Sequence, residues 1–169
     1  MITVKPLQKG EEFAMLRLAR VMHCESPVYN PYEFDDEKLM VWINLCLQSP
    51  DWLCLVAWDD LDPIGFIAVG SVPMLFSNAK SVDDLGLFVL PRKRGSSAAY
   101  RLVRFMEHWA KDKGACIRLG VTTGTNNSQT QRFLERFGYV QTGVLLTKNT
   151  TCPLPEEENG SMSRIVEGP

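Results

Sequence analysis

Several signatures that would assign a function directly are missing from this chain of 169 residues. No Gly-Lys-Ser or Gly-Lys-Thr occurs, which excludes the phosphate loop of the nucleotide triphosphatases. The dinucleotide-binding pattern G-x-G-x-x-G is absent as well. The apolar runs are too short to span a membrane, and the first residues do not follow the pattern of a signal peptide. We therefore expect no membrane association.

Charge of one sign is not in excess, because 18 Lys and Arg stand against 20 Asp and Glu. The net charge of −2 argues against nonspecific nucleic-acid binding as the main role. The cysteines form no C-x-x-C pair, so we expect neither disulfides nor a metal site. This usage predicts a reducing, cytoplasmic location, with four cysteines packed as small hydrophobes. The five are Cys24, Cys46, Cys54, Cys116 and Cys152.

The composition, 45% hydrophobic and 22% charged, is that of one globular domain with a substantial core. We assign this domain to residues 1–149. Residues 150–169 combine Pro153 and Pro155 with three consecutive glutamates and several Gly and Ser, which predicts a flexible acidic tail.

Hydrophobic periodicity predicts a strand, two helices, three strands, a helix, a strand, a helix and a last strand. Residues 71–81 are expected to be a connector. The predicted elements cover residues 2–8, 11–25, 35–49, 52–58, 64–69, 85–90, 98–113, 117–121, 127–138 and 139–147.

The clearest helical pattern is an apolar stripe made by Leu102, Phe105, Met106, Trp109 and Ala110. Gly114 follows this stripe, and glycine readily adopts the left-handed conformation in which many helices end, so we expect the helix to stop there. His108 lies off the stripe and is expected to be solvated.

The residues before this helix are the most informative part of the chain. An apolar strand reaches Pro91, a basic loop follows, and small residues then open the helix. The first turn of a helix has unpaired N–H donors, and small side chains let an anion approach them. Residues 87–99 therefore have the pattern of a phosphate-binding turn. A merely solvated basic turn is the alternative on these residues alone.

A second segment extends the pattern. It begins with Asn127 at a helix start and ends with an aromatic-rich turn at Gly138-Tyr139. Together with residues 89–102 and the element order, it resembles the GCN5-related N-acetyltransferase superfamily, over residues 1 to about 148. The Arg-Gly-Ser-Ser and Thr-Thr-Gly-Thr-Asn stretches also resemble acetyltransferase-like proteins encoded by phages.

The resemblance implies a mixed, mostly antiparallel α/β sheet of about six to seven strands, splayed at its centre and flanked by about four helices. It implies acetyl-coenzyme A as cofactor, bound along the main chain of Leu87 and Val89, with Leu87 near the thioester carbonyl as an oxyanion-type donor; plain core packing is the alternative for both residues. Asn127 is expected near the pantetheine arm, with a helix cap as the alternative. The pyrophosphate would lie on Arg94, Gly95, Ser96, Ser97, Ala98 and Ala99, although Ser97 stands where the family usually has Gly.

The same resemblance suggests a carboxylate as general base. Asp83 and Asp84 stand at the expected strand, and Asp83 has the matching offset from the loop; plain exposed acids are the alternative. Leu134 aligns with the family's usual tyrosine acid and has no proton to give. Catalysis would then depend on water, or be slow or absent.

Three functions follow as hypotheses. The first is acetyl transfer to a primary amine, on a small molecule or a protein, in a ternary complex. The second is a weakly active or inactive coenzyme A-binding or structural module, for example in a phage assembly. The third is binding of another phosphorylated ligand. Residues 22–36 are expected to select the acceptor, and residues 140–147 to offer an edge for a homodimer.

Overall fold

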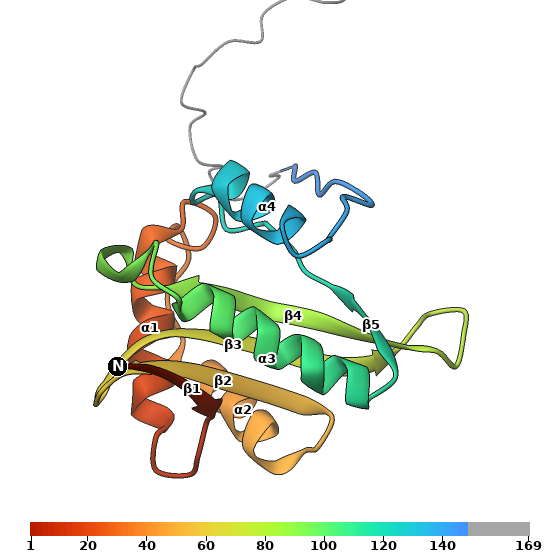
Figure 1. Cartoon of the computed structure of the whole chain (residues 1–169). Helices are drawn as coiled ribbons and strands as arrows, with labels where there is room; N and C mark the ends of the chain where they lie inside the picture. Colours follow the sequence, from red (N-terminus) through yellow and green to blue (C-terminus); the bar gives the residue numbers. More distant parts are fainter. Residues whose placement is uncertain (149–169) are drawn as a thin grey trace, which may run out of the picture.

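The computed structural model describes residues 1–148 and contains a single mixed sheet with helices on both faces (Figure 1). The sheet order is β1-β2-β3-β4-β5, with antiparallel neighbours except for the parallel pair β4 and β5. The elements are β1 (Ile2–Pro6), α1 (Glu12–Glu25), α2 (Asp36–Gln48), β2 (Trp52–Asp59), β3 (Asp62–Pro73), β4 (Lys80–Val89), α3 (Ala98–Asp112), β5 (Ala115–Arg118) and α4 (Asn127–Glu135).

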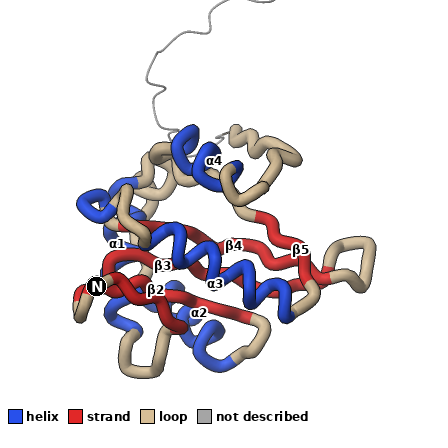
Figure 2. The backbone as a smooth tube through the Cα atoms, viewed as in Figure 1, coloured by secondary structure: helices blue, strands red, loops and turns tan. Residues whose placement is uncertain are grey.

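Two apolar cores lie on the two faces of the sheet, because strand side chains alternate between faces. On one face α3 places Leu102 and Met106, both fully buried, against the sheet. On the other face α1 and α2 contribute Leu18 and Ile43. Figure 2 shows α3 crossing the sheet on one side, with α1 and α2 on the other. The predicted α/β class is therefore confirmed.

Local signals placed several element ends correctly. Asp35 caps α2 by accepting a hydrogen bond from the Lys38 N–H at 2.9 Å. Gly114 follows α3 with a positive φ of 62°, as the stop signal predicted. The stripe on α3 is buried at Leu102, Met106 and Ala110, whereas Phe105 is 38% exposed.

The strand count differs from the prediction. Residues 1–148 form five strands rather than six to seven, and the expected strand at 139–147 is absent from this described part of the chain. A physical reason is that β5 has only four residues, so its outer edge offers little to pair with. Val144, Leu145 and Leu146 are instead largely exposed.

The predicted connector at residues 71–81 was also wrong in extent. β3 continues to Pro73 and β4 begins at Lys80, so the two strands form a long hairpin. The proposed tail at residues 150–169 lies outside the described residues.

Candidate functional site

The sheet opens between its two parallel strands. β4 and β5 pair only from Lys80 to Asp83, although β4 continues to Val89. The chain after Arg118 leaves β4, and a cleft of about 500 Å³ lies between the second half of β4, the loop before α3 and residues 119–134. This opening matches the splay that the resemblance implied.

The main chain of β4 faces this cleft. The Val89 carbonyl accepts a hydrogen bond from Arg94 Nε at 3.2 Å, whereas the Leu90 N–H donates to Ile64 of β3. In an antiparallel strand the N–H and C=O of one residue point to the same edge, and successive residues alternate. The N–H of Leu87 therefore points to the open edge, as Val89 does, and both residues line the cleft.

The loop after β4 presents unpaired donors. Gly95 has a φ of 83°, and an added Cβ there would meet no atom within 4 Å. No described residue accepts a hydrogen bond from the N–H groups of Gly95, Ser97 or Ala99. Ser97 stands at the cap position of α3, yet its Oγ accepts from Arg101 Nε at 3.2 Å instead of capping the helix. Backbone N–H groups at the start of a helix can hold an anion, so these groups and the start of α3 form a candidate anion cradle.

The cations of the loop are not free. They pair with carboxylates from three other elements: Arg92 with Asp62 (2.6 Å), Lys93 with Asp59 (2.7 Å) and Arg94 with Glu25 (2.6 Å). These three ion pairs fasten the loop to α1, β2 and β3. Arg101 is exposed and has no carboxylate partner among residues 1–148.

The two candidate carboxylates have different surroundings. Asp83 lies outside the cleft lining and forms a bidentate pair with Arg118, whose hydrogen bonds hold the pKa of Asp83 below its usual value. Asp84 lines the cleft and accepts a hydrogen bond from the Gly120 N–H at 2.7 Å. Burial raises the pKa of Asp84 above its usual value. The geometry thus favours Asp84, not Asp83, as the carboxylate available to a ligand.

The opposite wall of the cleft combines polar and apolar side chains. Its polar part is formed by Thr122, Thr123, Thr125, Asn126, Gln129 and Thr130. Hydrogen bonds fasten this wall to the end of α1: Ser26 Oγ donates to the Thr123 carbonyl at 2.5 Å, and Thr125 Oγ1 donates to the Glu25 carbonyl at 3.2 Å. Two segments about a hundred residues apart in sequence therefore form one rim.

The expected asparagine is displaced by one position. Asn126 lines the cleft and stands before α4 with a positive φ of 52°, whereas Asn127 is the first residue of the helix and is not among the lining residues. Asn127 therefore neither lines the cleft nor occupies the cap position, and the Asn126 side chain forms no capping hydrogen bond.

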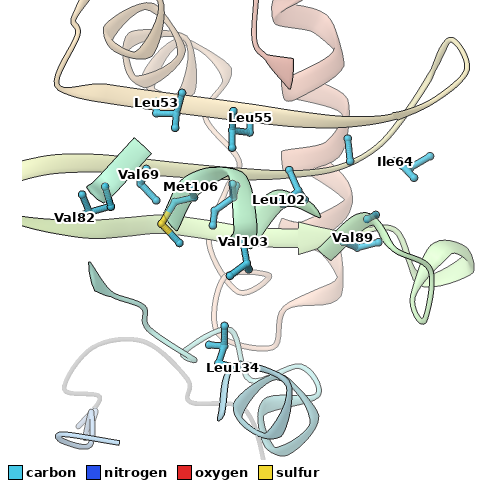
Figure 3. Close-up of a cluster of buried hydrophobic side chains, with 14 residues drawn as sticks. Leu53, Leu55, Ile64, Val69, Val82, Val89, Leu102, Val103, Met106 and Leu134 are labelled. Atoms are coloured by element: carbon cyan, nitrogen blue, oxygen red, sulfur yellow. The ribbon is translucent and has the colours of Figure 1, made fainter. Parts of the chain in front are cut away.

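Leu134 of α4 also lines the cleft. It is 5% exposed and belongs to the same cluster of buried side chains as Leu102 and Met106 (Figure 3). Tyr139 does not line the cleft, and burial together with the nearby Glu107 carboxylate raises its pKa. Of the described lining residues, Tyr29 carries the one phenol hydroxyl.

The structure brings together most of the predicted loop and strand residues. Leu87, Val89, Arg94, Gly95, Ser96 and Ala99 line the cleft. Ala98 is instead fully buried in the core, and the Ser97 side chain lies outside the lining. Glu25 lies within residues 22–36, the segment expected to select the acceptor, but its ion pair with Arg94 of the loop was not predicted.

The cysteines are less buried than predicted. Cys54 is buried and Cys46 is partly so, but Cys24 and Cys116 are exposed. Within residues 1–148, no three His, Cys, Asp or Glu side chains are grouped so that they could hold a metal ion. None of the described helices combines the length and apolarity needed to cross a membrane.

Comparison with known proteins agrees with this geometry. The model of the acetyltransferase (GNAT) family matches residues 17–139. No curated protein sequence matches the chain.

Solved structures share the fold at low identity. One is AAC(6')-Iy in complex with the bisubstrate analogue CoA-S-monomethyl-acetylneamine, at a TM-score of 0.71 and 18% identity, with 90% of this chain and 99% of that chain covered. Another is the aminoglycoside antibiotic 6'-N-acetyltransferase AAC(6')-Ih from Acinetobacter baumannii. Its TM-score is 0.69 and its sequence identity 17%, with 89% of this chain and 99% of that chain covered. A transcriptional regulator from Bacillus halodurans C-125 is also similar. Its TM-score is 0.69 and its sequence identity 18%, with 88% of this chain and 99% of that chain covered.

Proposed function

Because the chain belongs to the acetyltransferase (GNAT) family, we propose that it binds acetyl-coenzyme A in the cleft and transfers the acetyl group to a primary amine within a ternary complex. One observation carries this proposal. The open edge of β4 at Leu87 and Val89 leads directly into a loop with unpaired N–H groups at Gly95, Ser97 and Ala99.

The residues present suit the cofactor. The N–H groups around Gly95 and the start of α3 would hold the pyrophosphate, and no Cβ obstructs the approach at Gly95. Arg101 adds a positive charge one turn along the helix. The main chain of Val89 would bond the amide groups of the pantetheine arm, much as a neighbouring strand would.

Bound acetyl-coenzyme A supplies an activated acetyl thioester. In the balanced reaction, the amine nitrogen loses one proton and bonds to the acetyl carbon, the carbon–sulfur bond breaks, and the sulfur gains one proton. Asp84, whose carboxylate lines the cleft and is not held in an ion pair within residues 1–148, accepts the proton from the amine, directly or through water. The Leu87 N–H stabilises the charge that develops on the acetyl oxygen. Leu134 has no proton to donate, so water protonates the sulfur, whose ordinary pKa near 8.5 makes this feasible.

Calorimetric titration tests the cofactor assignment. We expect acetyl-coenzyme A and coenzyme A to bind, and Gly95→Ala to weaken both at least tenfold, because a side chain disfavours the left-handed backbone of the cradle. Gly10→Ala is the matched control: Gly10 also has a positive φ and open space around it but lies outside the cleft. Failure of either coenzyme form to bind would refute the proposal, and binding of ATP alone would favour another phosphorylated ligand.

A second candidate, a coenzyme A-binding module with little or no turnover, is favoured by Leu134. This side chain lines the cleft as a buried apolar group and has no proton to donate. Thiol release distinguishes the two functions. Activity that falls about a hundredfold in Asp84→Asn supports the enzyme, whereas cofactor binding without thiol release across a panel of amines supports the module.

A further inference from the structure

A second cavity, of about 330 Å³, lies on the other face of the sheet from α3. We name it the apolar cavity. Its walls come from α1, α2, the connector between them and strands β2, β3 and β4. Side chains such as Met15, Leu39, Trp42 and Phe66 form most of its surface. The cavity is therefore large enough for a small organic group and is lined mainly by aliphatic and aromatic carbon.

The apolar cavity offers no negative charge to a ligand. None of its described lining residues is Asp or Glu. Burial raises the pKa of Cys46 to about 11, so this thiol stays neutral at pH 7. Near Phe34, Arg20 stacks over the ring at 4.8 Å and pairs with Asp36, which compensates its charge. An unpaired ammonium group placed deep in this cavity would lose its hydration without gaining a partner.

The apolar cavity adjoins the cofactor cleft. Met22, Tyr29 and Leu85 line both spaces. Leu85 is the extra residue of a bulge in β4, because Ala68 pairs with Gly86 while Val69 pairs with Asp84. The bulge places Leu85 between the two spaces, immediately next to Asp84. A molecule in the cavity can thus extend past Leu85 toward the β4 edge.

We infer that the apolar cavity binds the hydrophobic part of the acceptor, a primary amine that carries an aryl or branched alkyl group, with its nitrogen directed to the cleft. This inference rests on the proposed function for the reaction itself. A polycationic acceptor is disfavoured, because each additional ammonium group needs a carboxylate that the described lining does not provide. An aromatic ring, in contrast, gains contacts with Phe34 and Trp42.

Calorimetry on the full chain tests the inference with 2-phenylethylamine and spermidine as probes, each titrated with and without saturating coenzyme A. We expect 2-phenylethylamine to bind at least tenfold more tightly than spermidine. Equal or tighter binding of spermidine, or no binding of 2-phenylethylamine, would overturn it. The coenzyme A titration in the same experiment reports separately on the proposed function, since failure of the cofactor to bind leaves the amine comparison intact.

A variant that fills the cavity locates the binding. Ala19 lines the apolar cavity from α1, so Ala19→Leu should lower the affinity for 2-phenylethylamine at least tenfold and leave coenzyme A binding unchanged. Ala14→Leu is the matched control, because Ala14 is also partly buried on α1 but lies outside the lining. Leu39→Phe fills the same space from α2 and replaces Ala19→Leu should that variant not fold. Unchanged amine binding in the folded variant would refute this location.

Discussion

The guanidinium of Arg94 and the carboxylate of Glu25 meet at 2.6 Å across the rim of the cleft, although 69 residues separate them. Arg94 also donates to the Val89 carbonyl and lies over the Phe88 ring at 5.8 Å. One side chain thus joins the end of α1, the end of β4 and the loop before α3. Because the pair is compensated, Arg94 adds little net positive charge to the cleft in this state.

Neutralising Glu25 is expected to strengthen cofactor binding. Glu25→Gln leaves the charge of Arg94 uncompensated beside the cradle, so the affinity for coenzyme A should rise about threefold to tenfold at low salt. The gain should shrink as ionic strength increases. Calorimetric titration at two salt concentrations measures both effects.

The controls for this prediction come from the same loop. Arg94→Gln should weaken coenzyme A binding, whereas Arg92→Gln should have little effect, because Arg92 pairs with Asp62 and lies outside the cleft lining. Weaker binding in Glu25→Gln would show instead that the ion pair is needed to position the loop.

The adjacent carboxylates Asp84 and Asp83 are expected to affect stability in opposite directions. Burial raises the pKa of Asp84, so between the unfolded and folded pKa values the folded chain holds a proton that the unfolded chain has lost. Stability therefore falls as pH rises through this window. Asp84→Asn should raise the melting temperature at pH 7 and lose that advantage below about pH 4, near the unfolded pKa of an aspartate. The Asn oxygen can still accept from Gly120.

Asp83 supplies the control. Its pKa is lowered by Arg118, so its contribution is present at pH 7 and is lost as the pH falls through the folded pKa. Asp83→Asn should lower the melting temperature at pH 7. Thermal unfolding of both variants from pH 3 to pH 8 checks the signs, and equal shifts for the two would contradict the environments described above.

Leu134 is expected to act through packing rather than proton transfer. Leu134→Ala should reduce the free energy of unfolding by about 2–5 kcal/mol, because the side chain is 5% exposed within the buried cluster that also contains Leu102 and Met106. Leu134→Met conserves the side-chain volume and should reduce the free energy of unfolding by less than about 1.5 kcal/mol. Urea unfolding measures both. A greatly reduced rate of thiol release in a stable Leu134→Met would indicate a catalytic role that packing does not explain.

The hydrogen bond that fastens the rim is also expected to matter. Ser26 is 1% exposed and donates to the Thr123 carbonyl at 2.5 Å. Ser26→Ala should cost about 1–3 kcal/mol of unfolding free energy and speed amide exchange in residues 122–125, because a partly buried acceptor loses its partner. Ser77→Ala, in the exposed loop between β3 and β4, is the control. Equal exchange in both variants would argue against a fastened rim.

Local features of the site could be predicted from the sequence. The apolar strand before Pro91, the small residues at 95–99 and the stripe on α3 are signals contained in short stretches, and each appears in the structure. The choice between Asp83 and Asp84 was not accessible in this way. It depends on Arg118 and Gly120, which reach β4 only through the folded chain.

Two other differences have the same origin. Residues 139–147 have strand composition, but a strand needs a partner edge, and the four-residue β5 offers a short one. Asn126, in the left-handed conformation just before α4, lines the cleft, whereas Asn127 does not. The local residue pattern does not predict whether a neighbouring strand edge is available or which backbone conformation Asn126 adopts.

The sequence by itself determined the order of elements as far as α4, the strand-loop-helix junction at residues 87–99 and the family resemblance, because periodicity, small residues and turn signals act over a few neighbouring positions. The tertiary structure alone decided which charges are free, which carboxylate reaches the cleft, and that an apolar cavity adjoins it at Leu85. These properties arise from contacts between distant segments. Arg94 with Glu25 and Ser26 with Thr123 are such contacts, and only the packed chain brings their atoms together.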